Sequence, residues 1–165
     1  MANLILWRHA EAEIMPLNGK DIDRALTKGG RKDAAKMAKW LNQHLPKNTE
    51  ILCSPARRCL ETAATLNDES NYKNLHATRY EIKQAKFLGV DSTVEAIAEQ
   101  VVNDDSSKTI LLIGHQPNLG QLIAKLLGMD EATCVVKKGS VWWLRQRFIN
   151  GASQTYLFTV QQPDY

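Results

Sequence analysis

Two apolar runs that each lead to a histidine constrain the fold of this 165-residue chain more than any other feature. The first, residues 4–7, continues into Arg8 and His9, and the second, residues 110–113, ends two residues before His115. Continuous apolar runs of this length are typical of parallel strands that are buried on both faces. Because ligands bind where such strands end in open α/β sheets, we expect both histidines at one edge of a sheet.

A third, shorter run at residues 51–53 is followed by a Ser54-Pro55 turn and then by Arg57 and Arg58. Three strand ends would then bring two imidazoles and several guanidinium groups to the same edge. Arginine binds phosphate through charge-assisted and often bidentate hydrogen bonds. The three runs together therefore predict a phosphate-binding site.

The composition fits one globular domain spanning residues 1–165. Hydrophobic residues make up 44% and charged residues 24% of the chain, which excludes disordered and collagen-like classes. The formal net charge of +3 is only mildly basic, and the 21 Lys and Arg residues are spread along the chain. No basic stripe alternates with aromatic residues, so nucleic-acid binding is not indicated.

Cysteine usage and the absence of targeting signals bear on where the protein works. Three cysteines, an odd number without paired spacing, favour reduced thiols in a cytoplasm and imply no metal site. No apolar segment approaches the ~20 residues that cross a bilayer, and the N-terminus lacks a signal-peptide pattern. We expect a cytoplasmic protein without a membrane partner, and a monomer is the favoured state.

Apolar residues at helical spacing alternate with the strand-like runs. Polar connections are predicted at residues 67–74 and 103–108. Helices are predicted from the cap Thr27 through Leu45, over residues 57–66, from a capping box of Ser92 and Glu95 to residue 102, and from Pro117 to Gly128.

The C-terminal part differs from the rest of the chain. Residues 140–148 and 155–161 are rich in Val, Trp, Tyr and Phe, and Asn150-Gly151 between them is a strong turn signal. These features predict a terminal β-hairpin. With strands and helices alternating before it, the predicted fold is a three-layer α/β/α sandwich whose central sheet is mostly parallel.

Arg8 and Arg58 suit a histidine that acts as a nucleophile. An imidazole attacks only through an unprotonated nitrogen, and nearby guanidinium groups lower its pKa from about 6.5. The two arginines would keep His9 neutral and would also bind the oxygens of a transferring phosphoryl group.

Four motifs carry a resemblance to a known family. In order and spacing they resemble the histidine phosphatase superfamily, and in particular its short bacterial branch, the phosphohistidine phosphatases of the SixA type. The resemblance covers about residues 3–127. The motifs are Leu-Trp-Arg-His-Ala-Glu at 6–11, Arg-Ala-Leu-Thr-Lys-Gly-Gly at 24–30, Ser-Pro-Ala-Arg-Arg-Cys-Leu-Glu-Thr-Ala at 54–63 and Gly-His-Gln-Pro at 114–117.

The resemblance implies specific roles for four residues. His9 would become phosphorylated, Arg8 and Arg58 would bind the phosphoryl group, and His115 would donate a hydrogen bond to it from the opposite side. No cofactor or metal is implied.

The register of the third motif selects one of its two arginines. In the family pattern the pocket arginine lies four residues after the serine and four before the threonine, which here selects Arg58 between Ser54 and Thr62. Arg57 is then a rim or surface charge. Arg24, in the second motif, either lines the entrance of the pocket or fixes its loop.

One departure from larger members of the family bears on the substrate. Those members take a carboxylate general acid from the segment between the second and third strands, where residues 81–88 offer only Glu81. An alkoxide leaving group needs a proton in the transition state, whereas the imidazole of phosphohistidine is much less basic. The missing acid therefore favours a phosphoramidate substrate, and the lack of a long insertion predicts an open pocket that admits a protein.

The sequence thus predicts a phosphatase that removes phosphate from phosphohistidine on a partner protein, such as a phosphotransfer domain in signal transduction, through a covalent phospho-His9 intermediate. The alternatives are a broad small-molecule phosphomonoesterase of the same superfamily and a noncatalytic phosphoprotein-binding module. A cysteine-dependent low-molecular-weight phosphatase fits less well, because its loop needs an arginine six residues after the cysteine and Cys59 stands six residues after Cys53.

Overall fold

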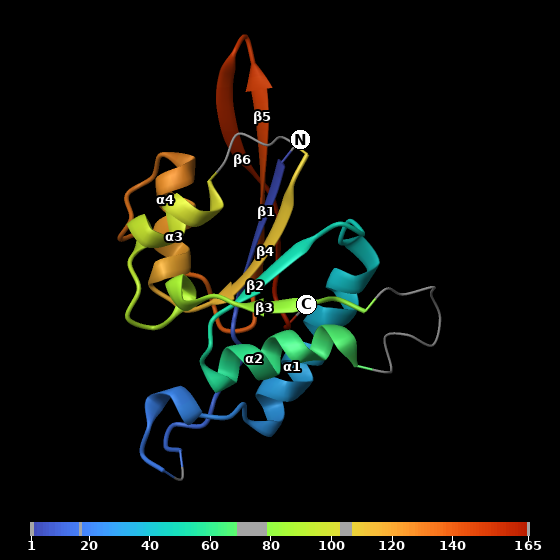
Figure 1. Cartoon of the computed structure of the whole chain (residues 1–165), viewed down its shortest axis with the longest axis vertical. Coiled ribbons are helices and arrows are strands. Elements are labelled where there is room, and N and C mark those ends of the chain that lie inside the picture. Colours follow the sequence, from blue (N-terminus) through green and yellow to red (C-terminus); the bar gives the residue numbers. More distant parts are fainter. Residues whose placement is uncertain (1, 17, 69–78, 103–106, 165) are drawn as a thin grey trace.

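A computed structural model describes residues 2–16, 18–68, 79–102 and 107–164 of the chain. Strands and helices alternate along these residues (Figure 1). The strands are β1 (Ala2–Arg8), β2 (Glu50–Cys53), β3 (Ile82–Gln84), β4 (Thr109–Gly114), β5 (Val141–Ile149) and β6 (Ala152–Gln161). The α-helices are α1 (Lys28–His44), α2 (Arg57–Ala64), α3 (Val94–Val101) and α4 (Asn118–Leu127).

The six strands form one sheet in the order β3-β2-β4-β1-β5-β6. The pairs β2–β3, β2–β4 and β1–β4 are parallel, whereas β5 runs antiparallel to β1, and β6 antiparallel to β5. The sheet is therefore mostly parallel and ends in an antiparallel hairpin, as the sequence predicted.

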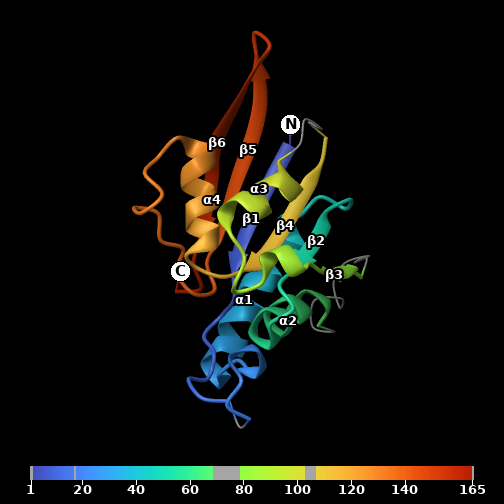
Figure 2. The same ribbon diagram turned by 60° about the vertical axis from the view of Figure 1, so that its left-hand side comes forward.

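Helices cover both faces of the sheet, with α1 and α2 on one face and α3 and α4 on the other (Figures 1 and 2). Successive side chains of a strand point to opposite faces. Ile5 and Trp7 accordingly pack in one buried cluster with Met37 of α1, and Leu6 packs in the other with Leu122 of α4. These two clusters confirm the three-layer sandwich.

The helix starts follow the capping signals with one correction. Thr27 caps α1, and its Oγ1 accepts a hydrogen bond from the backbone N–H of Gly30 at 2.9 Å. Helix α3, however, is capped by Thr93 and not by Ser92. The backbone N–H of Ser92 instead donates to the carbonyl of Gly89 at 3.0 Å, which places Ser92 in the preceding turn.

Two helix ends also bear on the predictions. Helix α2 was expected to reach Leu66 but ends at Ala64, where the chain tightens into a 3-10 turn at Thr65–Asn67. Helix α4 ends as predicted at Gly128, which has the left-handed conformation (φ +70°) that glycine adopts at no steric cost.

Asn150 and Gly151 form the turn of the hairpin, as predicted. Both have positive φ angles, 51° and 78°, which a two-residue type I′ turn requires. Ala2 at the start of β1 pairs with Gln146, so the turn extends beyond the amino-terminal end of β1 (Figure 1). The hairpin tip therefore lies at the end of the sheet opposite to His9.

Part of the sequence lies outside the described residues. The predicted connections at 67–74 and 103–108 fall mostly there. Among the residues that the structure describes, no helix has the length and apolar character of a membrane span.

Candidate active site

Three neighbouring parallel strands deliver their next residues to one edge of the sheet. Arg8, the last residue of β1, pairs with Gly114, the last residue of β4, so His9 and His115 follow side by side. The backbone N–H of His9 donates to the Gly114 carbonyl at 3.1 Å. Ser54 follows β2 on the other side of β4. The sheet register therefore places both histidines together.

His9 is held as a neutral imidazole with one defined tautomer. Its side chain is buried, with 6% exposed, and its Nδ1 lies 2.8 Å from the carbonyl oxygen of Ala10. Because a carbonyl can only accept, Nδ1 carries the proton and Nε2 keeps its lone pair. Burial, with the positive charges of Arg58 and Arg8 and the nearby His115, lowers the pKa of His9 to about 3.

The guanidinium groups of Arg8 and Arg58 lie beside this imidazole and retain unused donors. Arg8 Nη1 donates to the carbonyl of Val136 at 2.9 Å, and both terminal nitrogens of Arg58 donate to Asp21. Among the described residues, the buried Nε atoms of both arginines have no hydrogen-bond partner. Buried unpaired donors are costly, so these two favour an anion beside them.

His115 lies between Ser54 and Arg58. Its Nε2 is 2.8 Å from the Ser54 Oγ, and its Nδ1 is 3.5 Å from Nη2 of Arg58. Burial and the positive charge of Arg58 lower the pKa of His115 to about 4. At neutral pH both imidazoles are therefore uncharged, and the positive charge of the cluster belongs to the arginines.

Helix α2 holds Arg58 through a residue that the sequence analysis used only to count register. Thr62 Oγ1 donates to the backbone carbonyl of Arg58 at 2.7 Å and accepts from the backbone N–H of Ala10 at 3.1 Å. Thr62 thereby ties the helix to the residue after His9. Its place in the third motif was the available signal for this role.

A glycine allows α1 to approach the loop that follows His9. A Cβ at Gly30 would lie 2.1 Å from the carbonyl oxygen of Glu11, a distance that no side chain tolerates. The same carbonyl accepts from the backbone N–H of Thr27 at 3.0 Å. The second sequence motif therefore serves close packing at the amino-terminal end of α1.

Asp21 is a site residue that the sequence analysis missed. It lies in a 3-10 helix, Asp21–Asp23, in the loop between β1 and α1. Its carbonyl oxygen is 3.0 Å from Nη1 of Arg58, and its Oδ2 is 3.1 Å from Nη2. Nothing in the sequence connects the two, because they are 37 residues apart and an acidic residue is not expected in a phosphate site.

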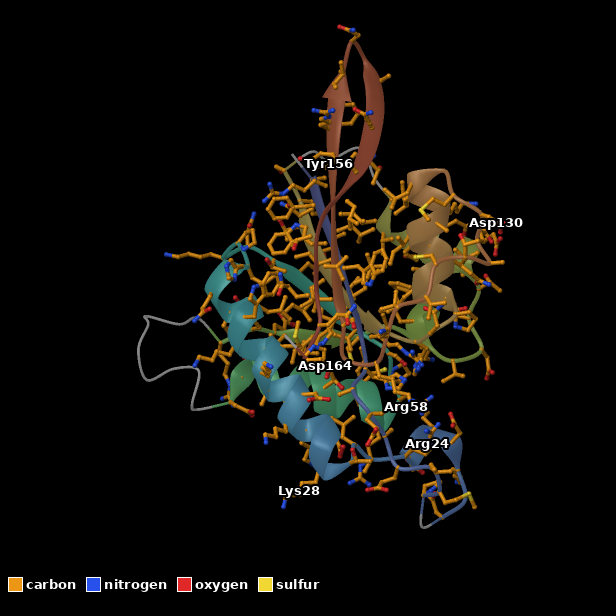
Figure 3. The ribbon with its side chains drawn as sticks, turned by 180° about the vertical axis from the view of Figure 1, so that it is seen from behind. Arg24, Lys28, Arg58, Asp130, Tyr156 and Asp164 are labelled. Carbon is orange, nitrogen blue, oxygen red and sulfur yellow. The ribbon has the colours of Figure 1, made fainter. Side chains whose placement is uncertain are left out.

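Arg24 fixes this loop, which is one of the two roles that the sequence left open for it. Arg24 Nε donates to the carbonyl of Glu13 at 2.6 Å, and its Nη1 donates to Oδ1 of Asp21 at 3.0 Å. The hydrogen bond from Arg24, together with Arg58, keeps the pKa of Asp21 below its usual value. Figure 3 shows Arg24 and Arg58 at the same end of the molecule.

Arg57 stays apart from the cluster, as the register of the third motif indicated. Its Nε lies 3.1 Å from Glu61 Oε1 one turn along α2, and the side chain is mostly exposed. Glu81 is exposed just before β3. The structure therefore brings together His9, Arg8, Arg58 and His115, and leaves Arg57 on the surface.

The cysteines are unsuited to act as nucleophiles. Cys53 and Cys59 are buried, and burial raises the pKa of the Cys59 thiol to about 12. A thiol in this state is a poor nucleophile. Within the described part of the chain, no three His, Cys, Asp or Glu side chains lie where they could hold a metal ion.

A hollow of about 550 Å³ adjoins the histidine–arginine cluster. Asp21 and Ser54, which contact Arg58 and His115, also line this hollow. Its other walls include the half-exposed side chains of Ile22 and Val90, each 48% exposed. The hollow offers room for a large group next to the cluster.

The sequence of the chain matches a known family. Residues 4–83 match the model of the histidine phosphatase superfamily, branch 1. Over 133 residues the chain is 30% identical to a phosphohistidine phosphatase SixA homolog from Haemophilus influenzae, covering 76% of this chain and 77% of that protein.

Solved structures share the fold. The protein histidine phosphatase SixA complexed with tungstate superposes with a TM-score of 0.70 at 19% identity, over 98% of this chain and 97% of that one. A phosphoserine phosphatase from Entamoeba histolytica in complex with 3-phosphoglyceric acid gives a TM-score of 0.66 at 17% identity, over 98% of both chains. The chain belongs to the histidine phosphatase superfamily, a family of hydrolytic phosphatases, and is SixA-like within it.

Proposed function

We propose that this protein removes the phosphoryl group from phosphohistidine on another protein, through a covalent phospho-His9 intermediate. One observation carries the proposal. His9 is a buried neutral imidazole with an unprotonated Nε2, and it lies beside two guanidinium groups whose buried Nε donors have no partner among the described residues. A nucleophile and an anion-binding pair are the parts that phosphoryl transfer needs.

In the first step, Nε2 of His9 attacks the phosphorus in line with the bond to the leaving imidazole. The P–N bond of the substrate breaks, and its electron pair returns to the leaving nitrogen. The positive charge that develops on His9 is stabilised by the hydrogen bond from Nδ1 to the Ala10 carbonyl. Arg8 and Arg58 bind the phosphoryl oxygens through the transfer.

No general acid is needed for this step. A substrate phosphohistidine that carries a proton on its other ring nitrogen leaves as a neutral imidazole. His9 starts as a neutral imidazole and ends as a phosphoimidazolium, while the substrate histidine changes in the opposite direction. The two histidines therefore exchange chemically equivalent states. The lack of an assigned carboxylate acid in residues 81–88 fits this exchange.

His115 contributes a hydrogen bond from the opposite side. A guanidinium nitrogen can only donate, so Nδ1 accepts from Nη2 of Arg58, and Nε2 carries the proton that it can donate to the Ser54 hydroxyl or to a phosphoryl oxygen. In the second step, water attacks the phosphorus of phospho-His9, the P–N bond breaks, and the electron pair returns to Nε2. The released product is dihydrogen phosphate, which keeps both protons of the water.

Two observations support a protein as the carrier of the phosphohistidine. The reacting imidazole is 6% exposed, so a substrate side chain must reach inward while its main chain stays at the mouth. The 550 Å³ hollow beside the cluster leaves room for that main chain and its neighbours. The relative from Haemophilus influenzae is named a phosphohistidine phosphatase homolog, which agrees with this substrate class.

A side-by-side rate measurement tests the proposal. The purified protein is expected to dephosphorylate a phosphorylated histidine phosphotransfer domain much faster than phosphoserine, phosphotyrosine or small phosphate esters. The His9→Ala variant should lose turnover and any acid-labile phosphoenzyme. Efficient hydrolysis of small esters, with the phosphoprotein left intact, would instead identify a phosphomonoesterase.

The same experiment separates the remaining alternatives. Binding of the phosphoprotein without release of phosphate by the unmodified enzyme would identify a noncatalytic binding module. Thiol alkylation should leave activity largely intact because Cys53 and Cys59 are buried. Inactivation by alkylation, with the label on Cys53, would favour a cysteine-dependent phosphatase.

A further inference from the structure

Asp21 places a carboxylate against the arginine that the proposed function assigns to phosphoryl binding. The Arg58 side chain is 5% exposed, whereas that of Asp21 is 55% exposed. The aspartate therefore contacts the buried guanidinium from the solvent side. Its backbone carbonyl and its carboxylate each take one terminal nitrogen of Arg58.

This two-point contact fixes the plane of the guanidinium group. A guanidinium has five N–H donors in a rigid fork. Nη1 and Nη2 each give one hydrogen to Asp21, which leaves the Nε–H and the second hydrogen of Nη2 along one edge, on the side where Nη2 also lies 3.5 Å from Nδ1 of His115. An edge with two parallel donors matches two oxygens of a phosphoryl group. The Nε on that edge is buried and unpaired among the described residues.

We propose that Asp21 is a positioning residue that orients Arg58 so that its Nε–Nη2 edge faces the phosphoryl group. This inference rests on the proposed function, since it assigns Asp21 a part in the same reaction. Asp21 acts through Arg58 and does not touch the phosphoryl group.

The contacts of Arg58 argue against the opposite role, in which Asp21 would occupy the place of the phosphate. A carboxylate in the phosphate position would pair with the buried Nε, yet that atom has no partner in the described part of the chain. Asp21 instead lines the neighbouring hollow. Asp21 and a phosphoryl group therefore use different edges of the guanidinium.

Asp21 is itself anchored well enough to serve as a fixed point. Its Oδ1 accepts from Nη1 of Arg24 at 3.0 Å, and its carbonyl also accepts from the backbone N–H of Arg24 at 3.1 Å. Arg24 in turn donates to the Glu13 carbonyl. The loop between β1 and α1 thus holds the carboxylate in place before a substrate arrives.

The test compares Asp21→Ala and Asp21→Asn with the matched control Asp23→Ala. Asp23 lies in the same 3-10 helix and hydrogen-bonds Asn18. Two readouts are used: kcat and KM on a phosphorylated histidine phosphotransfer domain, and the calorimetric Kd of tungstate, an anion that resembles phosphate.

Misplacement of a binding group costs up to about 100-fold in rate. Asp21→Ala is therefore expected to lower kcat/KM about 10- to 100-fold and to weaken tungstate binding. Asp21→Asn keeps an acceptor oxygen for Nη2 and should recover part of both. Asp23→Ala should stay within about twofold of the unmodified protein, as is usual for surface substitutions.

Two results would overturn the inference. Asp21→Ala could match Asp23→Ala in both readouts, or it could bind tungstate more tightly, which would mean that the carboxylate competes with the anion. Circular dichroism verifies that each variant folds. If Asp21→Ala does not fold, the comparison is made with Asp21→Asn. Tungstate binding needs no turnover, so it tests the role of Asp21 separately from the reaction. If the unmodified protein binds tungstate but does not hydrolyse phosphohistidine, the proposed function is refuted and the inference about Asp21 is not.

Discussion

The imidazole rings of His9 and His115 lie with their centroids 5.3 Å apart and their planes inclined by 59°. The parallel pairing of β1 with β4 sets this separation, because each ring belongs to the residue that follows its strand. Two charged imidazoles would repel each other at this distance beside two guanidinium groups. The arrangement is therefore that of two neutral rings, and this has measurable consequences.

The tautomer of His9 can be observed directly. In the free protein at pH 7.5, ¹⁵N NMR should show a protonated Nδ1 and an unprotonated Nε2, because Nδ1 donates to the Ala10 carbonyl. With its pKa lowered to about 3, the ring should not titrate between pH 7.5 and pH 5. A midpoint near 6.5, or a protonated Nε2, would contradict the nucleophile assignment.

Protein stability should fall as the pH drops below about 6.5. In the unfolded chain both histidines have pKa values near 6.5, whereas in the folded protein they are lowered to about 3 and about 4. The unfolded state therefore binds more protons in this range, and the contribution is full above pH 6.5 and is lost progressively as the pH falls toward the folded-state values.

Urea unfolding at two pH values measures this effect. From pH 7 to pH 5 the free energy of unfolding should decrease by about 2 kcal/mol for each of the two buried imidazoles. The double variant His9→Asn, His115→Asn should lose most of this decrease, while His44→Asn, on the exposed side of α1, should keep it. Equal pH dependence in all three proteins would refute the lowered pKa values.

Neighbouring arginines at the start of α2 should differ sharply in function. Arg58→Ala removes a buried guanidinium next to both histidines, so we expect kcat/KM to fall about 100-fold or more. Arg57→Ala removes an exposed ion pair with Glu61, which is worth at most about 1 kcal/mol. Steady-state kinetics on one substrate checks both, and similar losses in the two variants would contradict the site.

Adjacent glycines in the second motif should respond in opposite directions. Gly30→Ala would place a Cβ 2.1 Å from the Glu11 carbonyl oxygen and should destabilise the protein by about 1–3 kcal/mol. At Gly29 the nearest atom is 3.9 Å away, so Gly29→Ala should be neutral or stabilise α1 by up to about 1 kcal/mol. Denaturant midpoints measure both changes. If Gly30→Ala leaves the midpoint unchanged, the loop around Glu11 can move to make room for the added Cβ.

The hollow should matter for a protein substrate and not for a small one. Val90→Asp puts a charge on an apolar wall and should lower kcat/KM about 10-fold for a phosphorylated phosphotransfer domain. Hydrolysis of phosphoramidate itself should be unchanged. Ile149→Asp, at the far end of the hairpin, controls for an added surface charge. Equal losses on both substrates would place the effect in the chemistry and not in docking.

The sequence predicted the elements whose signals are local. Apolar runs predicted β1, β2 and β4, and the order of residues after them predicted that His9 and His115 lie at one edge of the sheet. The turn residues Asn150 and Gly151 likewise predicted the hairpin, because positive φ angles are a property of single residues.

The remaining features depend on contacts between distant segments. Asp21 reaches Arg58 across 37 residues, and its charge is the wrong sign for a simple phosphate site. Thr62 bonds the backbone of Ala10 across 52 residues. The shift of the α3 cap from Ser92 to Thr93 follows from a turn that uses the Ser92 N–H. Periodicity cannot reveal such pairings.

The reaction centre thus has one wall set by the sheet and another formed by loops. Strand register fixes both imidazoles, whereas η1 (Asp21–Asp23) and residues 89–92 border the neighbouring hollow without belonging to any strand. Under the proposed function, exchanging these surface loops between relatives would change which phosphorylated partner is accepted and would leave the histidine–arginine cluster intact. Such grafts would separate the choice of partner from phosphoryl transfer in this fold.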